Sequence, residues 1–161
     1  MSPLRMLLGS VLFGLASAHA LGADFSGTWR VDLRTPLERE QKAECGTAQF
    51  DLVQTGDRIT GSHSFATVGC GRLNEGGAGT VSGVVMGLKA VLIVTSGRNG
   101  AIQLGVATLD GDELQWISRE TIRESDTPGD SPLILGKGIL RRASAVHLSQ
   151  PNSSLQRDRE R

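Results

Sequence analysis

Hydrophobic and polar residues alternate along most of the chain between Phe25 and Arg142, which is the pattern of β-strands that bury one face. Gly, Asn and Asp interrupt the alternation about every eight to twelve residues. No window shows the 3.6-residue period of an amphipathic helix. The pattern predicts eight strands, at residues 25–33, 48–54, 59–65, 80–86, 89–96, 101–109, 113–120 and 133–142.

The connections between these strands are mostly short and contain residues typical of tight turns. Gly and Asn tolerate a positive φ, and Asp hydrogen-bonds to its own backbone. The turns are Gly56-Asp57, Gly87, Arg98-Asn99-Gly100 and Asp110-Gly111-Asp112. Short turns pair consecutive strands in antiparallel order, so the predicted topology is a meander.

An open meander of this size leaves two long unpaired edges, and closing the sheet removes both. The sequence therefore predicts an all-β fold, an eight-stranded antiparallel up-and-down β-barrel. A two-sheet sandwich is the alternative, but sandwiches usually need longer crossovers. Only the loops at 34–47 and 121–132 are long enough to serve as crossovers. Within the first loop, residues 36–43 predict one or two helical turns with Pro36 near their start.

The chain divides into three segments. Residues 1–20 are typical of a secretory signal peptide, because an apolar run at 6–16 is followed by Ala18-His19-Ala20, which fits the A-x-A cleavage pattern. A transmembrane anchor is the alternative, but the run is about half of the ~20 residues that span a bilayer. Residues 21–145 are the predicted barrel domain, and the polar residues 146–161 are the predicted disordered tail. We therefore expect a secreted or periplasmic protein that is not an integral membrane protein.

Cys45 and Cys70 are the only cysteines in the chain. In an oxidising compartment such a pair normally forms a disulfide, and the chain-entropy model gives it about 3 kcal/mol of stabilisation. The hairpin turn at 55–58 lies between the two residues, so we expect them on neighbouring strands, with a bulge absorbing an offset of about two residues. A metal site or a nucleophilic cysteine is the alternative. Because the chain offers few other soft ligands, no metal site is expected.

Gly27-Thr28-Trp29 opens the first predicted strand, and Arg141 and Arg142 end the last one. Together with the predicted eight-stranded meander, these residues resemble the calycin group of barrels, which includes the lipocalins and avidins. In calycins the Trp packs at the closed end of the barrel beneath a late basic residue. The resemblance therefore implies that Arg141 or Arg142 stacks on Trp29. Gly61-Ser62-His63 stands where avidins have Gly-Thr-Tyr, but with no Tyr and two Trp the chain lacks the aromatic residues of a biotin pocket.

His63 is the best candidate for contact with a ligand. It alternates with Ile59, Gly61 and Phe65, so it is expected to face the barrel interior or its mouth, where a polar group orients a ligand in an apolar cavity. The alternative is a histidine satisfied by a neighbour, or one on the opposite face, because alternation does not say which face is buried. The predicted ligand-binding residues are His63, Phe65, Phe50 and Trp116.

Composition and motifs exclude several classes of function. The 17 basic and 17 acidic residues balance, which gives no support to a nucleic-acid partner. Aromatic residues make up only 4% of the chain, which argues against a stacking platform for bases. The chain contains no Gly-x-Ser-x-Gly, no His-Glu-x-x-His and no phosphate loop. We therefore expect no catalytic residues, no cofactor and no enzymatic activity.

Two functions remain compatible with the sequence. The first is a secreted, non-enzymatic barrel that binds a small, mainly apolar molecule through burial of apolar area. The second is a barrel that binds a protein through the loops at 34–47 and 121–132, for instance a periplasmic inhibitor of a hydrolase. The distribution of side-chain volume discriminates between them. An open cavity with a polar group favours the small ligand, whereas a filled interior favours the protein partner.

Overall fold

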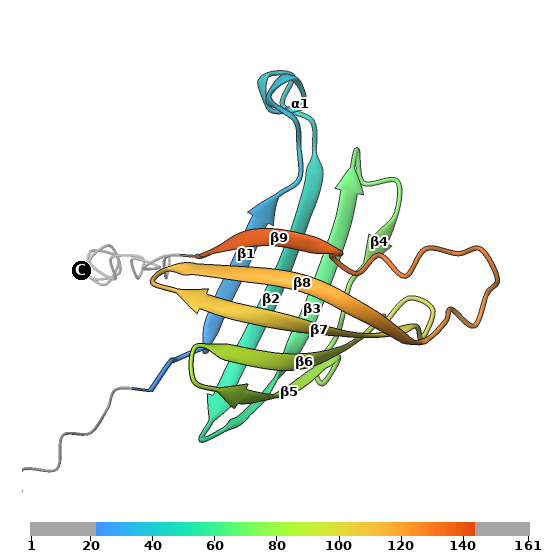
Figure 1. The fold of residues 1–161 in the computed structure, drawn as a ribbon. Coiled ribbons are helices and arrows are strands. Elements are labelled where there is room, and N and C mark those ends of the chain that lie inside the picture. The colour runs from blue at the N-terminus through green and yellow to red at the C-terminus, as the bar shows by residue number, and fades with distance from the viewer. Residues whose placement is uncertain (1–21, 144–161) are drawn as a thin grey trace, which may run out of the picture.

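We describe residues 22–143 of the chain in a computed structural model (Figure 1). The predicted signal peptide (1–20) and the predicted tail (146–161) lie outside the described residues. The described part contains one short helix and nine strands. In chain order they are β1 (Gly27–Asp32), α1 (Pro36–Glu40), β2 (Cys45–Thr55), β3 (Arg58–Val68), β4 (Leu73–Asn74), β5 (Val81–Met86), β6 (Lys89–Thr95), β7 (Ile102–Asp110), β8 (Glu113–Arg123) and β9 (Lys137–Arg142).

Eight of these strands close into a barrel in which every neighbouring pair is antiparallel. Around the barrel the order is β1, β2, β3, β5, β6, β7, β8 and β9, and β9 pairs with β1 to complete the ring (Figure 1). The two-residue strand β4 pairs with β3 alone. The predicted up-and-down barrel is therefore confirmed, and the sandwich is excluded.

The up-and-down topology gives the two ends of the barrel different connections. At one end, tight turns join β2 to β3, β5 to β6 and β7 to β8. The other end, which we call the mouth, carries the longer connections, at residues 33–44, 69–80, 96–101 and 124–136. Apart from the residues before β1, the long irregular segments of the described part of the chain thus all lie at the mouth.

The barrel interior is occupied by side chains. Every strand of the ring contributes to one buried cluster, because alternate residues on each strand point inward. Gly105 on β7 leaves the space that the Trp116 ring occupies, since a Cβ built there would overlap the ring. The cluster consists of Phe25, Trp29, Ala48, Phe50, Leu52, Ile59, Val81, Ala90, Leu92, Val94, Ala107, Leu109, Leu114, Trp116, Ile134, Leu135 and Leu140.

The end opposite the mouth is closed by Trp29 and Arg142. The Arg142 guanidinium carbon lies 4.1 Å from the centroid of the Trp29 ring, which is a cation–π contact. Arg142 also donates hydrogen bonds to the backbone oxygens of Ser26 and Asp24, and the Trp29 indole donates to the Phe25 oxygen at 2.9 Å. Arg141, the neighbouring candidate, has an 81% exposed side chain and pairs with Glu113. Of the two predicted arginines, Arg142 is therefore the one that stacks on Trp29.

The predicted strand at 133–142 is wrong in its first four residues, because β9 begins only at Lys137. Leu133, Ile134 and Leu135 are consecutive and all buried, at 6%, 8% and 4% exposure. A strand would place the middle residue on the opposite face from its neighbours. Leu133 has φ of 48°, a left-handed conformation that also ends the extended chain.

The predicted disulfide between Cys45 and Cys70 is present. Its geometry differs from a direct cross-strand pair, because Cys45 lies opposite Val68 in the β2–β3 register. Cys70 follows the end of β3 in a tight turn closed by its own N–H, which donates to the Thr67 oxygen at 3.0 Å. The turn absorbs the expected offset of two residues. The disulfide therefore ties the start of β2 to the turn after β3.

Replacing Arg142 by Ala is expected to lower the free energy of unfolding by about 1 to 3 kcal/mol, because the cation–π contact and the charged hydrogen bonds are lost together. Arg141→Ala is the matched control, and it should change stability by less than about 0.5 kcal/mol because its ion pair is exposed. Urea unfolding of the two variants beside the wild type measures both values. Equal effects of the two substitutions would contradict the assignment of Arg142 as the closing residue.

Candidate functional site at the mouth of the barrel

A segment of the β8–β9 connection closes the mouth. We call residues 131–136 the plug. Ile134 and Leu135 of the plug belong to the buried interior cluster, and Leu133 is buried beside them. Pro132, Leu133, Ile134 and Leu135 make no backbone–backbone hydrogen bond with any other described residue. Because buried backbone groups need partners, side chains of the wall must supply them.

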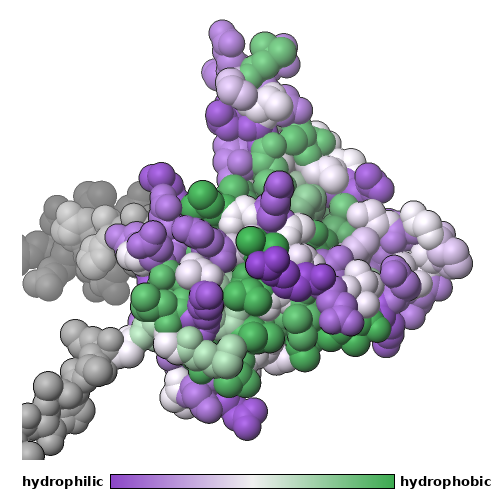
Figure 2. Space-filling model, in the orientation of Figure 1, coloured by the Kyte–Doolittle hydropathy of each residue, from purple (hydrophilic) through white to green (hydrophobic). Residues whose placement is uncertain are grey.

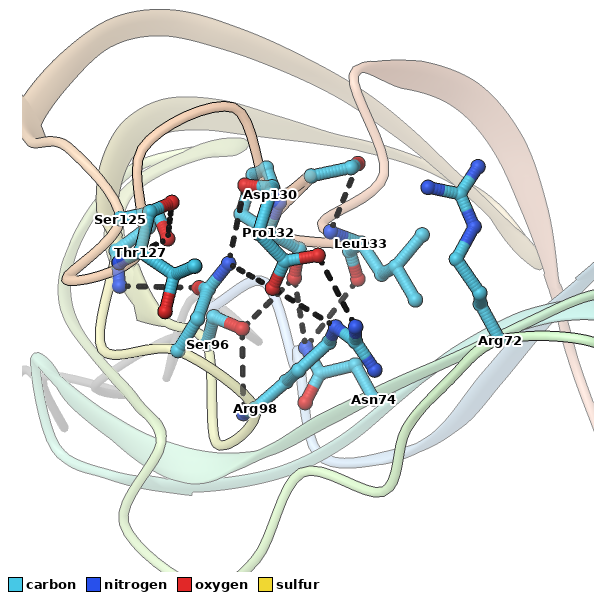
Figure 3. A network of polar contacts seen from close by, with 12 residues as sticks. Arg72, Asn74, Ser96, Arg98, Ser125, Thr127, Asp130, Pro132 and Leu133 are labelled. Atoms are coloured by element: carbon cyan, nitrogen blue, oxygen red, sulfur yellow. Dashed lines mark hydrogen bonds and ion pairs between the residues drawn. The ribbon is translucent and has the colours of Figure 1, made fainter.

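The outer half of the plug is held by two buried polar side chains (Figure 3). The Asn74 amide, on β4, donates to the Leu133 oxygen at 3.2 Å and lies 3.4 Å from the Pro132 oxygen. The Ser96 hydroxyl, just after β6, donates to the same Pro132 oxygen at 2.7 Å. Asn74 is 1% exposed and Ser96 is 2% exposed, so these bonds are shielded from water. Asn74 and Ser96 thus bind the plug from neighbouring positions, since both side chains approach the Pro132 oxygen.

The inner half of the plug is held by the backbone of Leu135. The Trp116 indole on β8 donates to the Leu135 oxygen at 2.5 Å. The Leu135 N–H donates to Nε2 of His63 on β3 at 3.3 Å. One plug residue therefore bridges two facing strands of the barrel through both of its backbone groups.

A partly exposed ion pair anchors the residue just before the plug. Arg98 contacts the Asp130 carboxylate through two nitrogens, at 3.1 and 3.0 Å, and Asn99 donates to the same carboxylate at 3.1 Å (Figure 3). The hydrogen bonds from Arg98 and then Asn99 hold the pKa of the Asp130 carboxyl below its ordinary value. The β6–β7 turn therefore fastens the start of the plug from outside.

His63 is the one titratable side chain inside this arrangement among the described residues. It is fully buried, and its ring lies 4.6 Å from the Phe50 ring, centroid to centroid. Burial lowers the pKa of His63 to about 4, so the imidazole is neutral near pH 7. Because Nε2 accepts a hydrogen bond, the proton is on Nδ1. Among the described residues, Nδ1 has no hydrogen-bond partner.

The structure brings together most of the predicted ligand-binding residues. Phe50, His63 and Trp116 form one packed group, in which the centroids of the Phe50 and Trp116 rings lie 5.2 Å apart. Phe65 is partly buried at the edge of the interior cluster, where it pairs in register with Asn74. Binding of a ligand by these four residues stays a prediction, because the plug fills the adjoining space.

Sequence reasoning singles out His63 and Trp116 but misses Asn74 and Ser96, the other two side chains that bind the plug. The pattern places Asn74 in a glycine-rich link and Ser96 at the end of a strand, with no role for either side chain. The available signal is the run Leu133-Ile134-Leu135, in which three consecutive apolar residues break the alternation. That run indicates a segment buried on all sides, for which the surrounding wall must provide polar partners.

A second feature of the mouth end is a projection. We call residues 34–44 the arm, and α1 lies at its tip (Figure 1). A capping box begins the helix, since the Thr35 hydroxyl accepts from the Glu38 N–H at 3.3 Å and the Glu38 carboxylate accepts from the Thr35 N–H at 2.6 Å. The helix buries none of its residues, and Leu37 is 60% exposed. Figure 2 shows a mainly hydrophilic projection with a hydrophobic group at its end.

Arg34 braces the base of the arm. It donates to the Ala43 oxygen at 2.9 Å, which joins the outgoing and returning segments of the arm, and it forms an ion pair with Asp32 at 2.9 Å. The hydrogen bonds from Arg34 lower the pKa of the Asp32 carboxyl to about 2. Cys45 follows directly, so the disulfide fixes the chain where it re-enters the barrel. The arm is therefore held in place although α1 does not pack on the barrel.

Within residues 22–143, no three His, Cys, Asp or Glu side chains lie close enough together to hold a metal ion. No helix in this part of the chain is long and apolar enough to cross a membrane.

Comparison of the chain with protein-family models gives no match, and comparison with curated proteins gives none. A function for this protein therefore has to be inferred from the geometry and chemistry of the described residues.

The buried His63 predicts a loss of stability in mild acid. The unfolded state takes up a proton near pH 6.5, whereas the folded state does so only near pH 4, so the unfolded state binds more protons between these values. The free energy of unfolding should therefore fall by about 2 kcal/mol between pH 7 and pH 5. Urea unfolding at the two pH values measures this difference.

The His63→Phe variant is the control for this effect. It has an aromatic ring of similar size and no titrating group, so most of the loss between pH 7 and pH 5 should disappear. Asp32 and Asp130 contribute little to the change between pH 7 and pH 5. Their pKa values are lowered from 3.8 in the folded state, so the stability they provide is lost only at lower pH. A wild type that is equally stable at both pH values would show that His63 is not buried as a neutral group.

Proposed function

We propose that this protein is a non-enzymatic, extracytoplasmic binding protein that inserts its arm into a cleft of another protein. The observation that carries the proposal is the arm itself. Its helix is capped, braced and pinned by a disulfide, yet α1 buries none of its residues. Leu37 of this helix stays 60% exposed and is therefore available to a partner.

The filled interior favours this function over a carrier of small molecules in the present conformation. Side chains from all the ring strands and from the plug form one buried cluster. The mouth, where a ligand of an open barrel enters, is closed by the plug and its polar partners. The barrel thus serves as a rigid support for its loops.

The braces of the arm support binding by reducing its entropic cost. Ordering a flexible loop on docking costs free energy for each side chain and backbone segment that is immobilised. In the arm, the capping box, the Arg34 bonds and the disulfide have already fixed the chain. Binding to a partner therefore loses little affinity to ordering of the arm.

The shape and chemistry of the arm favour a partner with an open cleft. A narrow projection with an apolar tip complements a concave surface with an apolar floor, and the charged residues that follow Leu37, at 38–40, suit a polar rim. The active-site cleft of a secreted hydrolase has this form, so inhibition of such an enzyme is the specific function that we propose. The disulfide fits a periplasmic or extracellular location, where such enzymes act.

The test compares Leu37→Asp with Val53→Asp. Both side chains are 60% exposed, but Val53 lies on β2, outside the arm. Inhibition is measured against a panel of purified secreted glycoside hydrolases and proteases. The wild type and Val53→Asp should inhibit at least one enzyme equally, whereas Leu37→Asp should weaken inhibition by about tenfold or more, as loss of a buried anchor does.

Two results would contradict the proposal. The first is that the wild type inhibits no enzyme of the panel. The second is that Leu37→Asp inhibits as well as Val53→Asp, which would place the contact elsewhere on the surface. A thermal melt of each variant checks that neither substitution unfolds the barrel.

A further inference from the structure

The unpartnered Nδ1 of His63 requires a physical explanation. The atom is buried with no hydrogen-bond partner among the described residues, and it carries the proton because Nε2 accepts from Leu135. Leaving a buried donor unpaired is unfavourable, and native interiors contain few such groups. A phenylalanine in the same space next to Phe50 would avoid this cost, but it would leave the Leu135 N–H without its acceptor. In the closed barrel, His63 therefore binds the plug through Nε2, while its Nδ1–H has no partner among the described residues.

The plug is the part of the interior that can leave without breaking the barrel. Its residues 132–135 belong to no strand and make no backbone–backbone hydrogen bond with other described residues. All the partners of these backbone groups are side chains: Ser131 of the plug itself, and Asn74, Ser96, Trp116 and His63 outside it. Leu133 is in a left-handed conformation that is unfavourable for a residue with a branched side chain. Displacement of the plug therefore leaves the sheet intact and relieves this conformation.

The plug also shows which chemistry the vacated space accepts. Leu135 presents an apolar side chain to the interior cluster and a carbonyl oxygen to the Trp116 indole. A small apolar molecule with a carbonyl group reproduces both contacts. When the Leu135 backbone leaves, the indole N–H of Trp116 loses its acceptor and Nε2 of His63 loses its donor. A neutral imidazole carries its proton on either ring nitrogen, so with the plug out the proton can move from the unpaired Nδ1 to Nε2, the nitrogen that faces the vacated space. Two N–H donors in an apolar chamber select a ligand that contains an acceptor.

We propose that the plug is displaceable and that the space occupied by Leu133–Leu135 is a latent binding site for a small apolar molecule bearing a carbonyl acceptor. Phe50 supplies an aromatic wall, and the N–H groups of His63 and Trp116 supply the polar contacts. The site does not involve the arm. A failed test of this site therefore leaves the proposed inhibition of a hydrolase intact, and the reverse also holds. Its apparent affinity is limited by the fraction of molecules in which the plug is out.

Acetophenone and ethylbenzene are matched probes for this site. They are nearly equal in size and shape, and only acetophenone has a carbonyl oxygen. The readout is the pair of indole N–H signals in a ¹H–¹⁵N NMR spectrum, because the chain has two Trp residues. Trp116 bonds to the plug, whereas Trp29 bonds to Phe25 at the other end of the barrel. Binding should move the Trp116 signal and leave that of Trp29 in place.

Two variants sharpen the experiment. Ser96→Ala removes a bond to the plug without entering the interior, so it should tighten binding of both probes several-fold by raising the open fraction. In the wild type and in Ser96→Ala, acetophenone should bind about five- to tenfold more tightly than ethylbenzene. His63→Phe should reduce this preference. The arm variant Leu37→Asp should bind both probes as the wild type does.

Three results would overturn the inference. In the first, neither probe moves the Trp116 signal, up to its solubility limit, in the wild type or in Ser96→Ala. In the second, both indole signals move together, which indicates non-specific binding. In the third, acetophenone and ethylbenzene bind equally in Ser96→Ala. This last comparison uses the native His63, so it remains decisive if His63→Phe does not fold.

Discussion

The structure depends on how the mouth of the barrel is closed. Closing it with a non-strand segment brings backbone N–H and C=O groups into an apolar interior, where each needs a partner. His63 and Trp116 satisfy the two backbone groups of Leu135, and Asn74 and Ser96 satisfy the carbonyls before it. These four side chains come from β3, from β8, from β4 and from the residue after β6. The same bonds that fill the barrel therefore also fasten its wall across the mouth.

The two ends of the barrel differ in how they are closed. At the end opposite the mouth, Trp29 and Arg142 form a compact contact between the first and last strands, and tight turns join the other strands. At the mouth, the connections are long, and one of them is the arm that carries α1. Because the Trp29–Arg142 contact and the tight turns close one end compactly, the long irregular segments all lie at the mouth. Both proposed sites, the arm and the space under the plug, lie at that end.

Alternation of apolar and polar residues predicts the strands, their closure and the inward direction of His63, because these features depend on local pattern and on edge pairing. It does not predict the plug, since Leu133-Ile134-Leu135 has no period that separates a strand from a segment buried on all sides. The bond between Asn74 and Leu133 joins residues 59 positions apart, and nothing local encodes it. The choice of Arg142 over Arg141 needs the register of β9. The resemblance to calycins stays a prediction.

Native-state hydrogen exchange tests most directly whether the plug separates from the wall. The amide of Leu135 bonds to a side chain of the wall, whereas the amides of Leu92 and Ala107 lie in central strands of the barrel. If the plug opens on its own, the Leu135 amide should exchange with a clearly lower opening free energy than those two amides, and it should respond weakly to denaturant. An opening free energy equal to that of global unfolding would show that the plug is an integral part of the core.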